Sequence, residues 1–152
     1  MNIVETGWLS SIAYAFAIIG MISVSYFSDK TLNRKTFIWV FLLISSLAFY
    51  GSYLVGTDNF WLSFVLLVIA GASLCAPFGP FFALIAETLP RNVAGVSIAL
   101  INSIGALGSF VGSYIVGYLH GTGQVGQSFL FMSGSLFLAS VLVILAVRGR
   151  KP

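Results

Sequence analysis

Five apolar stretches, each long enough to cross a lipid bilayer as a helix, dominate this sequence. An α-helix rises about 1.5 Å per residue, so about 20 apolar residues span the hydrocarbon core of a bilayer. The stretches cover residues 8–27, 36–55, 60–86, 93–119 and 129–147. Their apolar residues run continuously rather than in alternation, which disfavours a membrane β-barrel. The sequence therefore predicts an all-α, polytopic membrane protein whose five transmembrane helices form a single bundle over residues 1–152.

The composition makes the lipid bilayer the main environment of the chain. Of its 152 residues, 59% are hydrophobic and 7% are charged, and the mean hydropathy is +1.03. Ordinary soluble domains carry about 25% charged residues. Lys and Arg lie in short patches between apolar stretches, so we expect no nucleic acid as a partner. A single cysteine, Cys75, and a single histidine, His120, cannot form a zinc site from Cys and His alone, so we expect no metal or cofactor. The sequence shows no P-loop lysine, H-E-x-x-H motif or Ser/His/Asp set, so we expect no enzymatic activity.

The basic residues indicate how the chain is oriented in the membrane. All seven fall on one side of the predicted spans: Lys30, Arg34, Lys35, Arg91, Arg148, Arg150 and Lys151. Cytoplasmic loops are enriched in Lys and Arg, and the opposite side carries Glu5, Asp58 and a neutral loop around His120. We therefore expect a multi-pass protein of the inner or plasma membrane, with its N-terminus outside and its C-terminus in the cytoplasm.

The connection after the first span carries a partial motif. Residues 25–35 read SYFSDKTLNRK, which resembles the G-x-x-x-D-R-x-G-R-R loop of the major facilitator superfamily. The acid and the bases of that motif are matched by Asp29, Lys30, Arg34 and Lys35, whereas Ser25 and Leu32 stand where it has glycine. The resemblance implies an acid that pairs with bases across the cytoplasmic face and locks one state of a transport cycle. On charge alone, the loop is instead a solvated segment that only sets the topology.

Most of the remaining chain resembles one group of that superfamily. Residues 76–121 are similar to helices ten and eleven of its anion:cation symporters, in particular of bacterial sugar-acid carriers, and residues 5–30 are similar to helix eight with its following loop. The resemblance implies that the five spans are helices eight to twelve, a six-helix half-bundle that lacks one helix. Helices one to seven would then be absent, and with them most of the residues that couple proton entry to transport of an organic anion.

Asn102 is the main candidate for a substrate contact. Asn102 and Ser103 lie in the middle of the predicted span 93–119, where polar side chains are costly unless they meet another helix or water. In the family that the chain resembles, the position of Asn102 contributes to the polar floor of the substrate cavity, where an amide can bind carboxylate and hydroxyl oxygens. The alternative is a hydrogen bond between helices that only holds the bundle together.

Three more residues are candidates for the same site. Gly79 and Phe82 lie where helix ten of the family bends beside the cavity, and Pro80 between them removes a backbone donor and so exposes carbonyl groups. Simple kink geometry is the alternative there. Tyr14 in the first span is a further candidate, although tyrosine is also common in packing or facing lipid.

Two other features concern packing and charge. The span 93–119 is rich in small residues, including the G-x-x-x-G pair Gly108 and Gly112, which predicts that one face packs closely on another helix.

Glu87, at the end of the span 60–86, has two interpretations. It is either an acid that extends to interfacial water, or an acid that pairs with Arg91 or joins a gate.

Two classes of function remain. The first is the C-terminal part of a symporter for an organic anion such as a sugar acid, coupled to protons and active only when an N-terminal transporter half is supplied. The second is a membrane subunit or truncated relic that does not transport and has only a structural or interaction role. A region coding for helices one to seven directly upstream in the genome would indicate origin from a carrier, whereas an unrelated gene would favour an autonomous small protein.

Overall fold

The computed structural model describes residues 3–56 and 58–146, and six helices account for most of them. They are α1 (Ile3–Thr31), α2 (Arg34–Val55), α3 (Phe60–Cys75), α4 (Phe78–Thr88), α5 (Arg91–Gly121) and α6 (Val125–Ala146). Val147, the predicted end of the fifth span, lies outside the described residues, as do the basic residues Arg148, Arg150 and Lys151.

Five helical segments are long and apolar enough to cross a membrane. Helices α1, α2, α5 and α6 supply one segment each, and α3 and α4 together supply the fifth, Phe60–Thr88. In lipid, a helix satisfies its backbone donors and acceptors internally, which explains why long apolar stretches adopt this structure. The all-α, polytopic fold class predicted from the sequence is confirmed.

The segment Phe60–Thr88 is interrupted at Ala76 and Pro77. The sequence predicts a kink at this place, and the structure divides the segment into two helices there, while Ala76 and Pro77 keep right-handed helical backbone angles. Pro77 and Pro80 each lack the N–H that would continue the helical hydrogen bonds, and regular bonding resumes where the N–H of Phe81 donates to the carbonyl of Pro77 at 2.9 Å. Pro80 is fully buried. The break is therefore enclosed by protein rather than exposed to lipid.

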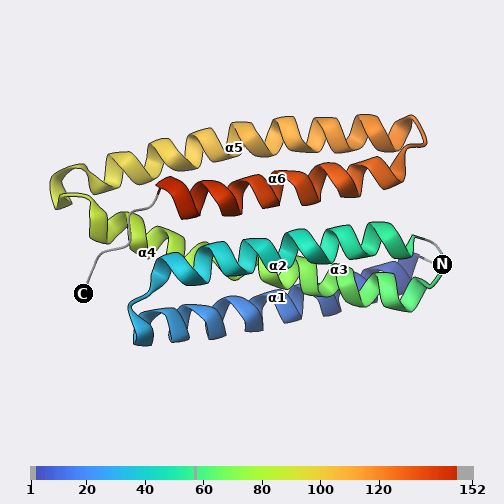
Figure 1. Cartoon of the computed structure of the whole chain (residues 1–152), viewed down its shortest axis with the longest axis horizontal. Coiled ribbons are helices and arrows are strands. Elements are labelled where there is room, and N and C mark those ends of the chain that lie inside the picture. Colours follow the sequence, from blue (N-terminus) through green and yellow to red (C-terminus); the bar gives the residue numbers. More distant parts are fainter. Residues whose placement is uncertain (1–2, 57, 147–152) are drawn as a thin grey trace.

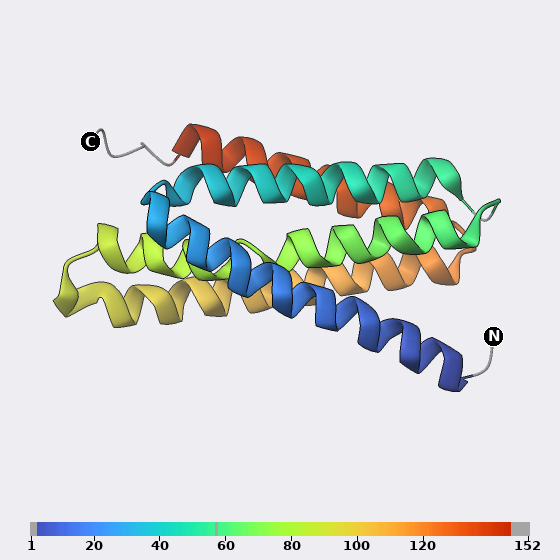
Figure 2. The same ribbon diagram turned by 90° about the horizontal axis from the view of Figure 1, so that it is seen from below.

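Helix α2 lies at the centre of the bundle. It packs on α6 and on α3, and α1 packs on the other side of α3. Helix α5 lies at the edge, against α6 and α4 (Figure 1). Figure 2 shows that α1 crosses the other helices obliquely and diverges from them toward its N-terminus. The best-packed part of the bundle is thus formed by α2, α3 and α6.

Buried serines hold α2 to its two neighbours. The hydroxyl of Ser46 donates to the carbonyl of Ser133 in α6 at 2.8 Å, and the hydroxyl of Ser133 donates to the carbonyl of Ser46 at 2.9 Å. On the other side, the hydroxyl of Ser45 donates to the carbonyl of Ala70 in α3 at 2.8 Å. Such bonds between membrane helices are worth about 0.6 kcal/mol each. The small serine side chains also allow the helix backbones to approach closely.

The connections between helices gather at two ends of the bundle (Figure 1). The α1–α2 and α4–α5 connections lie at one end, which we call the Arg34 end. The α2–α3 and α5–α6 connections lie at the other, which we call the Gly56 end. Gly56 terminates α2 with a φ of +57°, a left-handed conformation that glycine adopts without steric cost.

Candidate functional site

Arg34, the first residue of α2, connects three helices at the Arg34 end. Its Nη1 donates to Oδ1 of Asp29, in the last turn of α1, at 2.5 Å. Its Nε and Nη2 donate to Oε2 and Oε1 of Glu87, near the end of α4, at 2.9 and 2.7 Å. A two-point pair of this kind fixes the orientation of both groups in addition to balancing their charges. Arg34 therefore ties the ends of α1 and α4 to the start of α2.

The side chain of Arg34 is enclosed, whereas its two carboxylate partners face outward. It is 11% exposed, against 64% for Asp29 and 49% for Glu87. An enclosed cation depends on its partners, because loss of one leaves a charge that water solvates poorly. Glu87 thus has Arg34 as a partner while its carboxylate stays half-exposed, and a role in a gate stays a prediction. The pair of Glu87 with Arg91 lies outside the described side chains.

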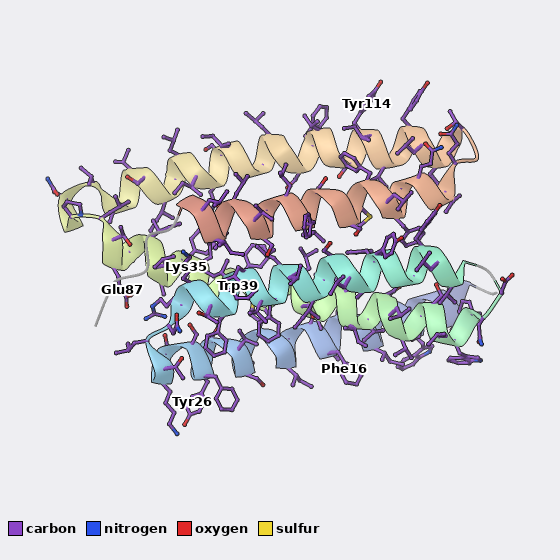
Figure 3. The ribbon with its side chains drawn as sticks, in the orientation of Figure 1. Phe16, Tyr26, Lys35, Trp39, Glu87 and Tyr114 are labelled. Carbon is purple, nitrogen blue, oxygen red and sulfur yellow. The ribbon has the colours of Figure 1, made fainter. Side chains whose placement is uncertain are left out.

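The other two bases of the motif differ in their surroundings. Lys35 donates from Nζ to the carbonyl of Ile144, in the last turn of α6, at 2.7 Å. The last carbonyls of a helix lack helical donors and carry partial negative charge, so an ammonium group stabilises them. Lys30, in the last turn of α1, is exposed. Figure 3 shows Lys35 and Glu87 at the same end of the bundle, where the motif joins four helices.

The turn between α1 and α2 forms even though the motif's second glycine is replaced. Leu32 occupies that position with a φ of +54°, in the left-handed region that side chains with a Cβ rarely adopt. Such a conformation costs a non-glycine residue on the order of 1 kcal/mol. Leu32 is 77% exposed, so little burial compensates for this cost. The glycine of the family motif thus corresponds to a real backbone requirement in this chain.

Ser25, which replaces the motif's first glycine, lies against Gly79 of α4. A Cβ atom added to Gly79 would stand 2.1 Å from Oγ of Ser25, which is too close for any side chain to fit without movement. Gly79 therefore allows α1 and α4 to touch just after the helix break. This contact gives Gly79 a packing role, and its role as a substrate contact stays a prediction.

The other candidate substrate residues lie on three different helices. Tyr14 of α1 is 72% exposed, and Asn102 of α5 is exposed as well. Phe82 of α4 is half-buried, with its ring 5.5 Å from that of Phe81 in an edge-to-face arrangement. Within the described residues, these side chains do not converge on a common partner. Ser103 donates to the carbonyl of Ala99 in its own helix at 2.9 Å.

The small-residue face of α5 is not packed against the other described helices of this chain, so the expectation of a close helix contact there stays a prediction. A Cβ added at Gly105, Gly108, Gly112 or Gly117 would meet no atom within 4 Å. None of the most apolar window of α5 is buried, and Tyr114 points away from the bundle (Figure 3). Small residues permit close packing but cannot specify which helix supplies it.

The family model described as Major Facilitator Superfamily matches residues 1–152. The chain belongs to the Major Facilitator Superfamily. This agrees with the resemblance of the loop around Asp29 and Arg34, and it accounts for the bundle of long apolar helices.

Several curated relatives match nearly the whole chain. A protein of Agrobacterium vitis named "Putative tartrate transporter" is 24% identical over 150 residues, which cover 98% of this chain and 33% of the relative. The "Cis,cis-muconate transport protein" of Acinetobacter baylyi is 26% identical, over 91% of this chain and 33% of its own length. The "Probable galactarate/D-glucarate transporter" of Bacillus subtilis is 28% identical, over 98% and 34%. The chain thus spans about a third of the length of these relatives. No solved structure matches it.

Proposed function

We propose that this chain is the C-terminal part of a symporter for an organic anion such as a sugar acid, and that it does not transport by itself. One observation carries the proposal: the matched relatives include proteins named for transport of tartrate, muconate and galactarate or glucarate, and they extend well beyond the region that this chain matches. In this proposal, the five spans correspond to helices eight to twelve, and the coupling ion is a proton.

The uneven burial of the helices supports a missing N-terminal half. In α2, 33% of the most apolar window is buried, compared with 11% in α1 and none in α5. Tyr14 and Asn102, two of the proposed substrate contacts, lie on these two exposed helices. Helices one to seven would cover the open sides of α1 and α5, and the anion would bind between the two halves near the middle of the membrane.

The cluster of Asp29, Arg34 and Glu87 is proposed as a latch at the cytoplasmic face. It joins α4, which follows the helix break, to the turn between α1 and α2. A transporter alternates between states in which such end-to-end contacts are made and broken. The exposure of both carboxylates gives water and other partners access to them, which makes the contacts reversible.

The latch is tested by reversing its charges in a carrier completed with an N-terminal half. Arg34→Glu should strongly reduce uptake, because three carboxylates then face each other. Adding Glu87→Arg restores an Arg and Glu pair and should recover part of the activity. A double variant no better than Arg34→Glu, at equal amounts in the membrane, would show that the pair has no role in turnover.

The orientation is tested by cysteine labelling in intact cells. After Cys75→Ser, Asn33→Cys and Arg150→Cys should be shielded from a membrane-impermeant thiol reagent, and Gly123→Cys should be labelled. The reason is the placement of all the basic residues on one side of the spans. Labelling of Asn33→Cys from outside would reverse the proposed topology.

The transport function is tested by fusion. The chain is joined to the N-terminal remainder of the tartrate transporter relative of Agrobacterium vitis, and a second fusion uses the muconate relative. We expect proton-driven uptake of the relative's anion into liposomes, and no uptake by either N-terminal part alone. If both fusions insert normally but neither transports, the carrier proposal is wrong and a purely structural role is favoured.

A further inference from the structure

The hydroxyl of Ser28, near the end of α1, is buried without a hydrogen-bond partner. Ser28 is 0% exposed, and no described residue forms a hydrogen bond with its Oγ. Other helical serines of this chain, such as Ser11 and Ser103, donate to the carbonyl four residues earlier at 2.9 Å. Ser28 does not make the corresponding bond to Val24. A buried hydroxyl without a partner makes the packing around it less stable than an apolar group of similar size would.

Ser28 lies on the side of α1 that touches α4. Residues three positions apart are neighbours on a helix surface, and Ser25, three residues before Ser28, lies so close to Gly79 of α4 that no side chain would fit at Gly79. Helices α1 and α4 pack directly on each other. Helix α4 therefore helps to enclose this part of α1, and a movement of α4 away from α1 would give Ser28 access to a partner.

Helix α4 is joined to α3 by an incomplete set of helical hydrogen bonds. Pro77 and Pro80 have no N–H, so the carbonyls of Ser73 and Ala76, four residues earlier in each case, lose their helical donors. Helices bend most readily at such interruptions. At its other end, α4 is held by the two hydrogen bonds from Arg34. Helix α4 therefore has a junction about which it can tilt and a charged contact that opposes the tilt.

We propose that α4 opens from α1 about the junction at Pro77, and that the buried hydroxyl of Ser28 favours this opening. In the closed arrangement that the structure shows, Arg34 holds α4 and the hydroxyl of Ser28 lacks a partner. In the open arrangement, this hydroxyl binds water or turns to the carbonyl of Val24. The missing bond lowers the ratio of closed to open molecules about tenfold. The role of this opening in transport rests on the latch proposed above, but the opening itself is measured without transport.

The test measures the distance between the ends of α1 and α4 in the full chain. After Cys75→Ser, spin labels are attached to Lys30→Cys and Thr88→Cys, which are exposed at these two helix ends. The chain is reconstituted in phosphatidylcholine, and double electron–electron resonance gives the distribution of distances. We expect a shorter and a longer population. Ser28→Ala, which removes the hydroxyl, should raise the ratio of the shorter to the longer population about tenfold.

Two further variants should act in the opposite direction. Arg34→Gln removes the charged contact that holds α4, and Gly79→Ala places a Cβ against Ser25, so each should increase the longer population. Ser28→Ala is also measured together with Arg34→Gln, where the larger open population makes its effect easier to detect. The matched control is Ser140→Ala, because Ser140 is 2% exposed but its hydroxyl donates to the carbonyl of Trp39 at 2.9 Å. We expect this control to leave the distribution unchanged.

Three results would overturn the proposal. A single distance that neither Arg34→Gln nor Gly79→Ala changes would mean that α4 does not open. A ratio that Ser28→Ala leaves unchanged or lowers, alone and with Arg34→Gln, would mean that the hydroxyl does not favour opening. Equal shifts in Ser28→Ala and Ser140→Ala would mean that the effect is not specific to the contact of α1 with α4. The latch is tested separately, by uptake after charge reversal, so failure of either proposal is recognised independently of the other.

Discussion

Reconstituted alone in liposomes with an inward proton gradient, the chain is expected to take up no hexonate or aldarate above the level of empty liposomes. A carrier of this superfamily alternates access by moving two helical bundles around a site between them. This chain provides one incomplete bundle. Its helices α1 and α5 are largely exposed, and no second bundle is present to move relative to them. The measurement is uptake of radiolabelled galactarate and gluconate over time.

The fusion to a relative's N-terminal part serves as the positive control for this experiment. Saturable uptake by the chain as a monomer would contradict the prediction. Uptake by a dimer, identified from the mass of the purified complex, would show that a second copy replaces the N-terminal half. In that case the proposal that the chain needs helices one to seven would be withdrawn.

Asn102→Ala is expected to weaken substrate affinity about tenfold to hundredfold in the completed carrier, since a hydrogen bond to a charged group contributes about 1.5–3 kcal/mol. The Asn102 side chain is exposed on α5 and, within the described residues, has no hydrogen-bond partner that would give it a structural role. Asn102→Leu should be at least as damaging, because it adds apolar bulk to the site. The measurement is the apparent Km for uptake at equal amounts of protein in the membrane.

Ser103→Ala is the matched control, one residue along the same helix. Its hydroxyl already binds the carbonyl of Ala99, so we expect its loss to change the apparent Km little. If both Asn102 variants reach the membrane and keep the affinity of the unmodified carrier, Asn102 is structural. The substrate site would then have to be sought elsewhere, with Tyr14 and Phe82 as the remaining candidates.

Much of the architecture could be predicted from the sequence because hydropathy is a local property. A stretch of about 20 apolar residues has few stable structures in lipid other than a helix, so the number and type of the spans follow from the sequence without knowledge of their neighbours. The loop motif around Asp29 and Arg34 indicated the family for a similar reason, since it is contained in eleven consecutive residues.

The packing of the helices was much harder to predict. Ser45 and Ser52 are seven residues apart, as are Ser133 and Ser140. Each of these four hydroxyls forms a hydrogen bond with a neighbouring helix, either with a backbone carbonyl or with a serine hydroxyl. A seven-residue spacing of serines within an apolar helix is therefore a sequence signal for contacts between helices. The small residues of α5 show the same difficulty, because glycines that suggest tight packing meet no other helix among the described residues.

The sequence by itself determined that the chain is an all-α membrane protein with five spans, and it indicated the superfamily. Only the tertiary structure decided that Arg34 pairs with Glu87, 53 residues away, that Gly79 lies against Ser25, and that the third span is two helices. Lipid solvates every apolar face of a helix about equally well, so the choice of neighbour depends on shape and on a few polar contacts. Those contacts join residues far apart in the sequence and exist only once the helices are assembled.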